Sequence, residues 1–232
     1  MPKTLIIIQA RMGSKRLPGK MMLKLNNYSI LEWVIKRTKK IKNKAAIIIA
    51  TTKEKKDDTI CKIAKNNKIK FFRGPTNDVL KRFYLAAKKF KPKFVVRICA
   101  DNPFIDYAEI DLLINKFKSK NKDYACNHNN KLNSLYADGF GAEIFTFRSL
   151  QEINNKAVKK TQREHVTKYI WDNKKKFKIY SIPANRMLAY PNLKFDINTK
   201  KDLRFMNSFV KKSDINIYTR AKQIIKLRKV YK

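Results

Sequence analysis

The chain has 232 residues, 44% of them hydrophobic, and it carries 55 lysines and arginines against 18 aspartates and glutamates. A chain of this length buries most of its surface in one core, so we expect a single main domain. The apolar runs are much shorter than the ~20 residues that span a bilayer, and the N-terminus lacks the apolar stretch of a signal peptide. These features exclude a membrane span and predict a cytoplasmic protein with no membrane partner.

The formal net charge of +37 is the strongest compositional feature. A charge of this size is typical of proteins that bind nucleic acids. The lysines, however, are spread along the whole chain, and lysine, asparagine and isoleucine are abundant where glycine, alanine and proline are scarce, as a coding bias toward A and T produces. We therefore expect no nucleic-acid partner, and a basic nucleic-acid-binding protein stays as the alternative from another class.

Short β-branched runs alternate with amphipathic helical patterns in the first half of the chain, which is typical of a mostly parallel sheet covered by helices. We expect strands at Thr4–Ala10, Ala45–Thr51, Ile69–Phe72 and Phe94–Cys99. We expect helices from the cap residue Ser29 to about Ile41, from Asp57 and Asp58 through Ala64, over Val79–Phe90, and through Ile110–Phe117. The fold class that these patterns predict is α/β.

The second half of the chain is less regular. It predicts a strand at Glu143–Phe147, helices near Arg148–Asn155 and Thr161–Trp171, strands near Phe177–Ile182 and Leu193–Ile197, and a helix over Lys200–Val210. Ile215 to Tyr231 has the pattern of a basic amphipathic helix that packs on the core or serves a dimer. We assign residues 1–212 to the main α/β domain and residues 213–232 to a basic C-terminal helix or tail.

The loop after the first strand carries the clearest functional signal. It reads QARMGSKRLPGK over residues 9–20, with four cations and one hydroxyl beside two of only five glycines in the chain. Ligands bind where loops leave the carboxyl ends of the strands of an open α/β sheet, and this loop can hold several oxyanions at once. Five residues separate Gly13 from Gly19 and Met21 stands where a Walker A loop has Ser or Thr, so a P-loop kinase is disfavoured.

The segment Ile8–Lys20 resembles the signature loop of the cytidylyltransferases that activate acidic sugars. That family includes enzymes that make CMP-KDO and CMP-sialic acid and a branch named for spore-coat polysaccharide biosynthesis. Other segments that resemble the family are Phe72–Leu80, Arg97–Pro103, Asp138–Gly139, Arg163–Val166 and Asp196–Leu203.

The resemblance implies a Rossmann-like nucleotide-diphospho-sugar transferase fold with helices on both faces of the sheet. It implies transfer of CMP from CTP to an acidic sugar or similar acceptor, with release of pyrophosphate, in surface polysaccharide or glycan biosynthesis. It also implies a homodimer. A nucleotidyltransferase that uses another NTP remains an alternative, because base selection depends on backbone contacts that a sequence does not show.

The resemblance further implies roles for individual residues. The expected catalytic residues are Arg11, Arg16, Lys20 and Asp101, because fixed cations stabilise the charge that departs with pyrophosphate. The expected nucleotide-binding residues are Ala10, Arg11, Gly13, Ser14, Lys20, Arg73 and Asp78. The expected acceptor-binding residues are Asp138, Gly139, Glu143, Arg163, Glu164 and His165. Asp78 could equally cap the helix at Val79, and His165 could equally be a core residue.

Magnesium is the cofactor that the resemblance implies. Asp101 follows the fourth strand and matches the metal-binding aspartate of the family, and magnesium commonly takes only one or two protein carboxylates. The second ligand of the family comes from a late D-x-D-T or D-T motif, which here reads Asp196-Ile197-Asn198-Thr199. Asp196 and Asn198 share one face of an extended segment, so we expect both to join Asp101 around the ion.

Overall fold

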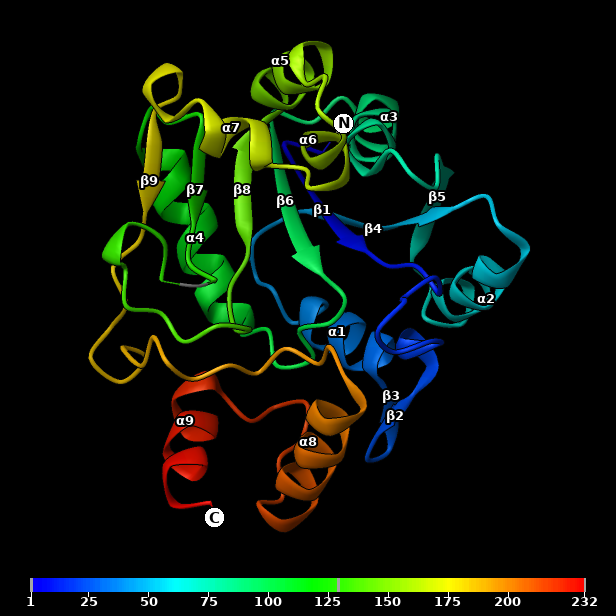
Figure 1. Cartoon of the computed structure of the whole chain (residues 1–232). Helices are drawn as coiled ribbons and strands as arrows, with labels where there is room; N and C mark the ends of the chain where they lie inside the picture. Colours follow the sequence, from blue (N-terminus) through cyan, green and yellow to red (C-terminus); the bar gives the residue numbers. More distant parts are fainter. Residues whose placement is uncertain (1, 129, 232) are drawn as a thin grey trace.

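The computed structural model describes residues 2–128 and 130–231. Within these residues a seven-stranded sheet has the order β5-β4-β1-β6-β8-β7-β9 (Figure 1). Its parallel neighbours are β5 (Lys70–Gly74), β4 (Ala46–Thr52), β1 (Thr4–Gln9) and β6 (Phe94–Cys99). β8 (Glu143–Thr146) runs antiparallel to β6 and to β7 (Tyr124–Cys126), and β9 (Ile179–Ser181) pairs with β7 in parallel. The carboxyl ends of the four parallel strands therefore meet at one edge.

Helices cover both faces of the sheet, as predicted. Successive residues of β1 face opposite sides, so Leu5 and Ile7 belong to one buried cluster while Ile6 and Ile8 belong to the other. The first face is covered by α3 (Val79–Phe90), α5 (Phe147–Lys156), α6 (Lys160–Glu164) and α7 (Lys168–Asp172). The second is covered by α1 (Ile30–Thr38), α2 (Asp58–Asn66), α4 (Tyr107–Ser119), α8 (Lys200–Lys212) and α9 (Ala221–Val230).

The chain between β1 and α1 forms a 3-10 turn, η1 (Lys20–Met22), and a small hairpin of β2 (Lys24–Leu25) and β3 (Tyr28–Ser29). Ser29 then caps α1, because its side chain accepts from the Glu32 amide while the Glu32 side chain accepts from the Ser29 amide. The predicted helix start is confirmed. Further 3-10 turns lie at η2 (Lys55–Asp57), η3 (Lys131–Asn133) and η4 (Lys174–Lys176).

Two predictions for the second half are wrong. The segment Thr161–Trp171 forms two short helices, α6 and α7, because His165 between them has extended backbone angles. Leu193–Ile197 is no strand of the sheet, although Lys194 makes an isolated bridge with Asp138. Its backbone bonds instead to loop residues: the Phe195 amide donates to the Asp138 carbonyl at 3.0 Å, and the Ile197 amide donates to the Asp101 carbonyl at 2.9 Å.

The segment after residue 212 packs against the main core. Ile224 and Ile225 of α9 are buried. Arg37 of α1 is also fully buried, and its guanidinium donates to the carbonyls of Ile105 at 2.6 Å, Ile217 at 3.2 Å and Thr219 at 2.9 Å. One side chain therefore ties α1 to the connection between α8 and α9. Over the described ranges, no helix has both the length and the apolar character that a membrane crossing requires.

Candidate active site

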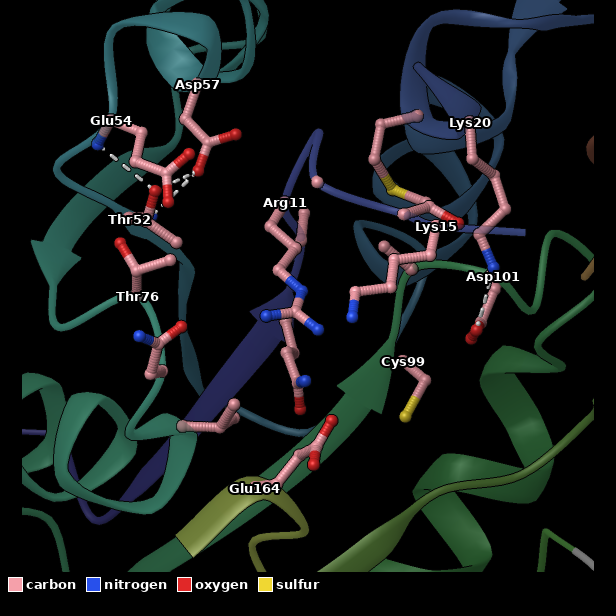
Figure 2. A pocket seen from close by; sticks show the side chains of 18 of the residues that line it. Arg11, Lys15, Lys20, Thr52, Glu54, Asp57, Thr76, Cys99, Asp101 and Glu164 are labelled. Carbon is pink, nitrogen blue, oxygen red and sulfur yellow. Dashed lines mark hydrogen bonds and ion pairs between the residues drawn. The ribbon is translucent and has the colours of Figure 1, made fainter. Parts of the chain in front are cut away.

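A polar cavity of about 880 Å³ lies at the carboxyl edge of the parallel strands. The loops after β1, β4, β5 and β6 form its walls, and α6 with the residue after it closes another side. Figure 2 shows Arg11 between two walls, with Thr52 and Thr76 on one side and the Lys20–Asp101 pair on the other. The predicted site residues that line the cavity are Ala10, Arg11, Gly13, Ser14, Arg16, Lys20, Asp101, Glu164 and His165.

The signature loop is fixed at its base by Asp57. This carboxylate is fully buried and accepts from the Met12 amide at 2.7 Å and from the Thr52 amide at 3.1 Å, as well as from the Thr52 hydroxyl. Gly19 at the far end of the loop has a φ of +68°, which a glycine adopts without strain. The loop after β4 therefore determines the shape of the loop after β1. The sequence suggested only a helix start at Asp57.

Lys20 connects the signature loop to the two segments that were predicted to hold magnesium. Its buried ammonium lies 3.1 Å from Asp101 Oδ2, 2.8 Å from the Ile197 carbonyl oxygen and 3.4 Å from Asn198 Oδ1. Arg16 reaches the same amide oxygen of Asn198 at 2.8 Å. The structure thus brings together four of the residues that the sequence placed around the phosphates and the ion.

Asp138 and Asp196 lie near enough to Asp101 for the three negative charges to interact, although of the three only Asp101 lines the cavity. Burial and the negative charge of Asp196 raise the pKa of Asp138 to about 6. Burial and the charge of Asp101 raise the pKa of Asp196. A divalent cation would relieve this repulsion, and carboxylate and amide oxygens are ligands that magnesium accepts.

The donor set therefore fits magnesium, although the described residues contain no group of three or more His, Cys, Asp or Glu side chains in metal-binding geometry. Magnesium commonly completes its shell with water and phosphate oxygens, so such a group is not required. The amide of Asn198 is oriented by its neighbours, because its nitrogen donates to Asp196 while its oxygen faces Arg16 and Lys20. The roles of these residues as ligands stay a prediction.

Gly139 explains how Asp138 comes close to Asp196. Its φ is +109°, and a Cβ at this position would lie 3.1 Å from Phe195 Cβ. Only glycine lets the chain approach so closely with that backbone conformation. Asp138 and Gly139, which were predicted to bind the acceptor, thus lie near Asp101 and Asp196, the two carboxylates that were predicted to hold magnesium.

Several predicted residues lie outside the cavity lining. Arg73 supports the loop after β4 from behind, donating to the carbonyls of Thr52 at 2.8 Å and Glu54 at 2.9 Å. Asp78 caps α3 by accepting from the Lys81 amide at 2.8 Å, and it pairs with Arg163 at 2.7 Å. Their ligand-binding roles are not tested by this geometry.

Arg163 is engaged by protein groups, since it donates to the carbonyl of Asn154 at 2.7 Å as well as to Asp78. Its hydrogen bonds join α6 to α3 and α5. His165 by contrast is exposed and lines the cavity, so the reading of it as a core residue is wrong.

Glu143 lies below the cavity, with its side chain only 3% exposed. It is ion-paired with Arg97 and accepts from the hydroxyls of Tyr124 at 2.6 Å and Thr167 at 2.8 Å. Burial alone would raise the pKa of Glu143, but the charge of Arg97 and the hydrogen bond from Tyr124 help to hold that pKa well below its usual range. Arg97 in turn lines the cavity and donates to Gln9 Oε1 at 3.2 Å. Glu143 thus orients the side chain of Arg97, which lines the cavity.

The sequence prediction missed a second set of cavity residues: Gln9, Lys15, Lys56, Thr76, Asn77, Arg97 and Lys160. Three of them carry a signal that could have found them. Arg97 lies two residues before Cys99 on β6, and Thr76 and Asn77 lie in the loop that follows β5. Lys56 and Lys160 lie in lysine-rich surroundings that single out neither of them.

A mostly parallel sheet covered on both faces, with a cation-lined cavity at its carboxyl edge, is typical of nucleotide-binding proteins of Rossmann-like fold. A sequence profile described as cytidylyltransferase matches residues 5–232. The chain therefore belongs to the cytidylyltransferase family, and the family resemblance of the signature loop is confirmed.

Individual relatives agree with this assignment. The chain is 38% identical over 223 residues to the uncharacterized protein MJ1063 of Methanocaldococcus jannaschii, covering 96% of this chain and 89% of the relative. It is 28% identical over 228 residues to the spore coat polysaccharide biosynthesis protein SpsF of Bacillus subtilis, covering 96% and 92%. The structure of a cytidylyltransferase from Leptospira borgpetersenii is similar with a TM-score of 0.86 at 31% identity, covering 99% of this chain and 94% of that one.

Proposed function

We propose that the protein transfers CMP from CTP to an acidic sugar or a similar anionic acceptor, with magnesium as cofactor and pyrophosphate as second product. The observation that carries the proposal is the placement of the signature-loop cations opposite Asp101 in one cavity, joined through Lys20. Such an arrangement surrounds a polyphosphate with positive charge beside an oxygen-rich cation site.

The chemistry assigned to these residues is an in-line displacement. An acceptor oxygen attacks the α-phosphorus of CTP, its bond to phosphorus forms, and the bond from phosphorus to the pyrophosphate oxygen breaks. Arg11, Arg16 and Lys20 stabilise the charge that develops on the transferring and leaving groups. Asp101 and Asp196, with the amide oxygen of Asn198, would hold magnesium, which would supply positive charge at the phosphates and lower the pKa of the attacking hydroxyl, whose proton leaves to solvent.

The two walls of the cavity suit different parts of the nucleotide. Thr76 lies on the wall away from Asp101 (Figure 2), and its chain neighbour Asn77 also lines the cavity. Both are neutral hydrogen-bonding side chains, and we place the base against them. Lys160 and His165 lie at α6 and its end, together with Glu164, and we assign this side to the acceptor. A carboxylate on the acceptor would find a cation there.

The name of SpsF supports surface polysaccharide or glycan synthesis as the process that uses the product. The predicted homodimer belongs to the same proposal, and size-exclusion chromatography with light scattering tests it directly.

The decisive assay measures pyrophosphate release with CTP, UTP, GTP and ATP in parallel, with and without magnesium. Each nucleotide is combined with a panel of acceptors that includes an octulosonate, a nonulosonate and phosphorylated polyols, and the products are identified by mass. The proposal expects a CMP adduct only when CTP and magnesium are both present. Protein that binds no nucleoside triphosphate with magnesium contradicts it, and a product with another NTP supports the alternative.

A further inference from the structure

Arg82 of α3 is a buried arginine directly behind the nucleotide cavity. Its side chain is fully buried and packs over Gly74, the last residue of β5. A Cβ built at Gly74 would lie 2.9 Å from Arg82 Cγ and 2.8 Å from Phe72 Cε1. Gly74 has no positive φ, so the glycine provides space for the arginine stem, and no unusual backbone angle requires it.

The guanidinium of Arg82 holds two successive carbonyls of the loop between β5 and α3. Its Nη1 donates to the Pro75 carbonyl at 2.6 Å and to the Thr76 carbonyl at 3.3 Å. The side chains of Thr76 and Asn77 in the same loop line the cavity. The loop is therefore held from its inner side by Arg82 while its outer side faces the nucleotide site.

This arrangement is unfavourable for stability. In the described part of the chain, Nε and Nη2 of Arg82 are buried without a hydrogen-bond partner. Burial and the nearby charge of Arg11 lower the pKa of Arg82 to about 10, against the opposing effects of Asp57 and Asp78. Buried donors without partners destabilise a fold, so Nε and Nη2 offset part of the stability that the two carbonyl bonds of Nη1 contribute. Stability alone therefore does not explain this arginine.

We propose that Arg82 is a positioning residue for base selection. By holding the carbonyls of Pro75 and Thr76 toward the interior, it fixes the direction in which the Thr76 hydroxyl and the Asn77 amide meet the base. Cytosine and uracil differ at two adjacent ring positions: cytosine has an amino donor at C4 and an acceptor at N3, whereas uracil has an acceptor at C4 and a donor at N3. A fixed loop distinguishes them, whereas a loop free to rotate its peptides pairs with either.

This inference rests on the proposed function, so the test uses nucleotide binding, which needs no acceptor. Titration calorimetry gives the affinities for CTP and UTP with magnesium for wild-type protein and for Arg82→Met, Arg82→Lys and Gly74→Ala. Lys81→Met is the matched control, because Lys81 is the exposed neighbour of Arg82 on the same helix. Thermal unfolding of each variant is measured alongside.

We expect the preference for CTP over UTP to fall about tenfold in Arg82→Met, a loss typical of one hydrogen-bonding contact. Arg82→Lys keeps the charge without the planar fork and falls by a similar factor. Gly74→Ala displaces the arginine stem and changes the preference in the same direction. Arg82→Met stays folded with a melting temperature near that of wild type, because the loss of two unpaired donors offsets the loss of the two carbonyl bonds, and Lys81→Met keeps the wild-type preference.

The outcomes are separable. Wild-type protein that binds no nucleoside triphosphate contradicts the proposed function and this inference together. Wild-type protein that prefers CTP, with folded Arg82 variants that prefer it equally, contradicts the inference alone. Failure of all three variants to fold also overturns it, since Arg82 would then serve stability.

Discussion

Lys20 Nζ lies 3.1 Å from Asp101 Oδ2, so a cation of the signature loop is paired with the carboxylate that is proposed to hold magnesium. The same ammonium contacts the carbonyl of Ile197 and the amide oxygen of Asn198. It thus compensates the negative charge at this end of the cavity in the protein alone. If CTP binds with magnesium as proposed, Lys20 would exchange these oxygens for those of the phosphates.

Replacement of Asp101 tests the metal assignment. In Asp101→Asn we expect turnover to fall by about a thousandfold or more, because magnesium loses its charged ligand at the transferring phosphate. The melting temperature should change little, since the side chain of Asp101 is 32% exposed. Asp214→Asn is the control, because Asp214 is exposed and its φ of 47° suits asparagine. Activity of Asp101→Asn close to wild type would remove Asp101 from the site.

Asn198 stands where the family motif has a carboxylate, and Asn198→Asp restores it. The added charge lies beside Asp196, so we expect magnesium to bind roughly three- to tenfold more tightly in the presence of CTP. The variant should also unfold more easily without magnesium, because the amide that donates to Asp196 is lost. Calorimetric titration with magnesium in the presence of CTP measures the affinity, and thermal unfolding without magnesium measures the stability. An unchanged affinity would place Asn198 outside the ion's reach.

Asp57 should control the affinity for the triphosphate without touching it. In Asp57→Asn one carboxylate oxygen becomes an NH2 group that faces either the Met12 amide or Thr52, so the signature loop loses an anchor. We expect the KM for CTP to rise by about tenfold, as the loss of one charged hydrogen bond predicts. Thr52→Ser, which keeps the hydroxyl, should retain the wild-type KM. An unchanged KM for CTP in a folded Asp57→Asn protein would contradict this role.

Glu143 and Arg97 should contribute to stability as a pair. Glu143→Gln leaves the guanidinium of Arg97 without its counter-charge in a buried position, and we expect the free energy of unfolding to fall by about 3 kcal/mol. Denaturation with urea measures it. Glu152→Gln removes an exposed partner of Lys156 and should leave the midpoint unchanged. A Glu143→Gln protein of wild-type stability that no longer uses the acceptor would instead favour the predicted acceptor-binding role.

His128 should make stability depend on pH in a defined window. Burial lowers the pKa of His128 from its ordinary 6.5 to about 4, so the unfolded chain binds a proton there that the folded protein does not. His128 therefore leaves the free energy of unfolding at its full value above about pH 6.5. It lowers the free energy of unfolding progressively as the pH falls toward about 4.

The raised pKa of Asp138, about 6, acts in the opposite direction, because its folded state takes up a proton more readily. The useful comparison is thus wild type against His128→Gln, by urea denaturation at pH 7.5, 6 and 5. We expect the stability of wild type relative to the variant to decline as the pH falls. Parallel curves would show that His128 does not titrate as its surroundings indicate.

The first half of the fold was predictable because its signals are local. Leu5–Ile8 and Ile47–Ile49 are short β-branched or apolar runs between clear helical patterns, and they form β1 and β4. The alternation of Leu193, Phe195 and Ile197 gives the same signal at a place where no sheet strand forms. There the apolar residues pack inward while the backbone bonds to Asp138 and Asp101, a choice made by tertiary packing.

The site was predictable where its residues are contiguous. One wall of the cavity is formed from residues 10–20. Because this wall comes from a single contiguous segment, its charged side chains could be identified from the sequence. Asp57 and Arg82 were not predicted, because in the sequence Asp57 has the appearance of a helix start and Arg82 that of a charged residue on a helix. Their contacts with Met12 and with the loop carbonyls are seen only in the structure. Their roles depend on which loops the sheet order places side by side.

The burial of Arg37 also has a consequence for biosynthesis. Its guanidinium needs the carbonyls of Ile217 and Thr219, which are translated some 180 residues after it. A nascent chain that has not reached these residues offers it only the Ile105 carbonyl, so α1 cannot complete its packing on the ribosome. The buried guanidinium therefore gains these two partners only after the C-terminal segment has been synthesised.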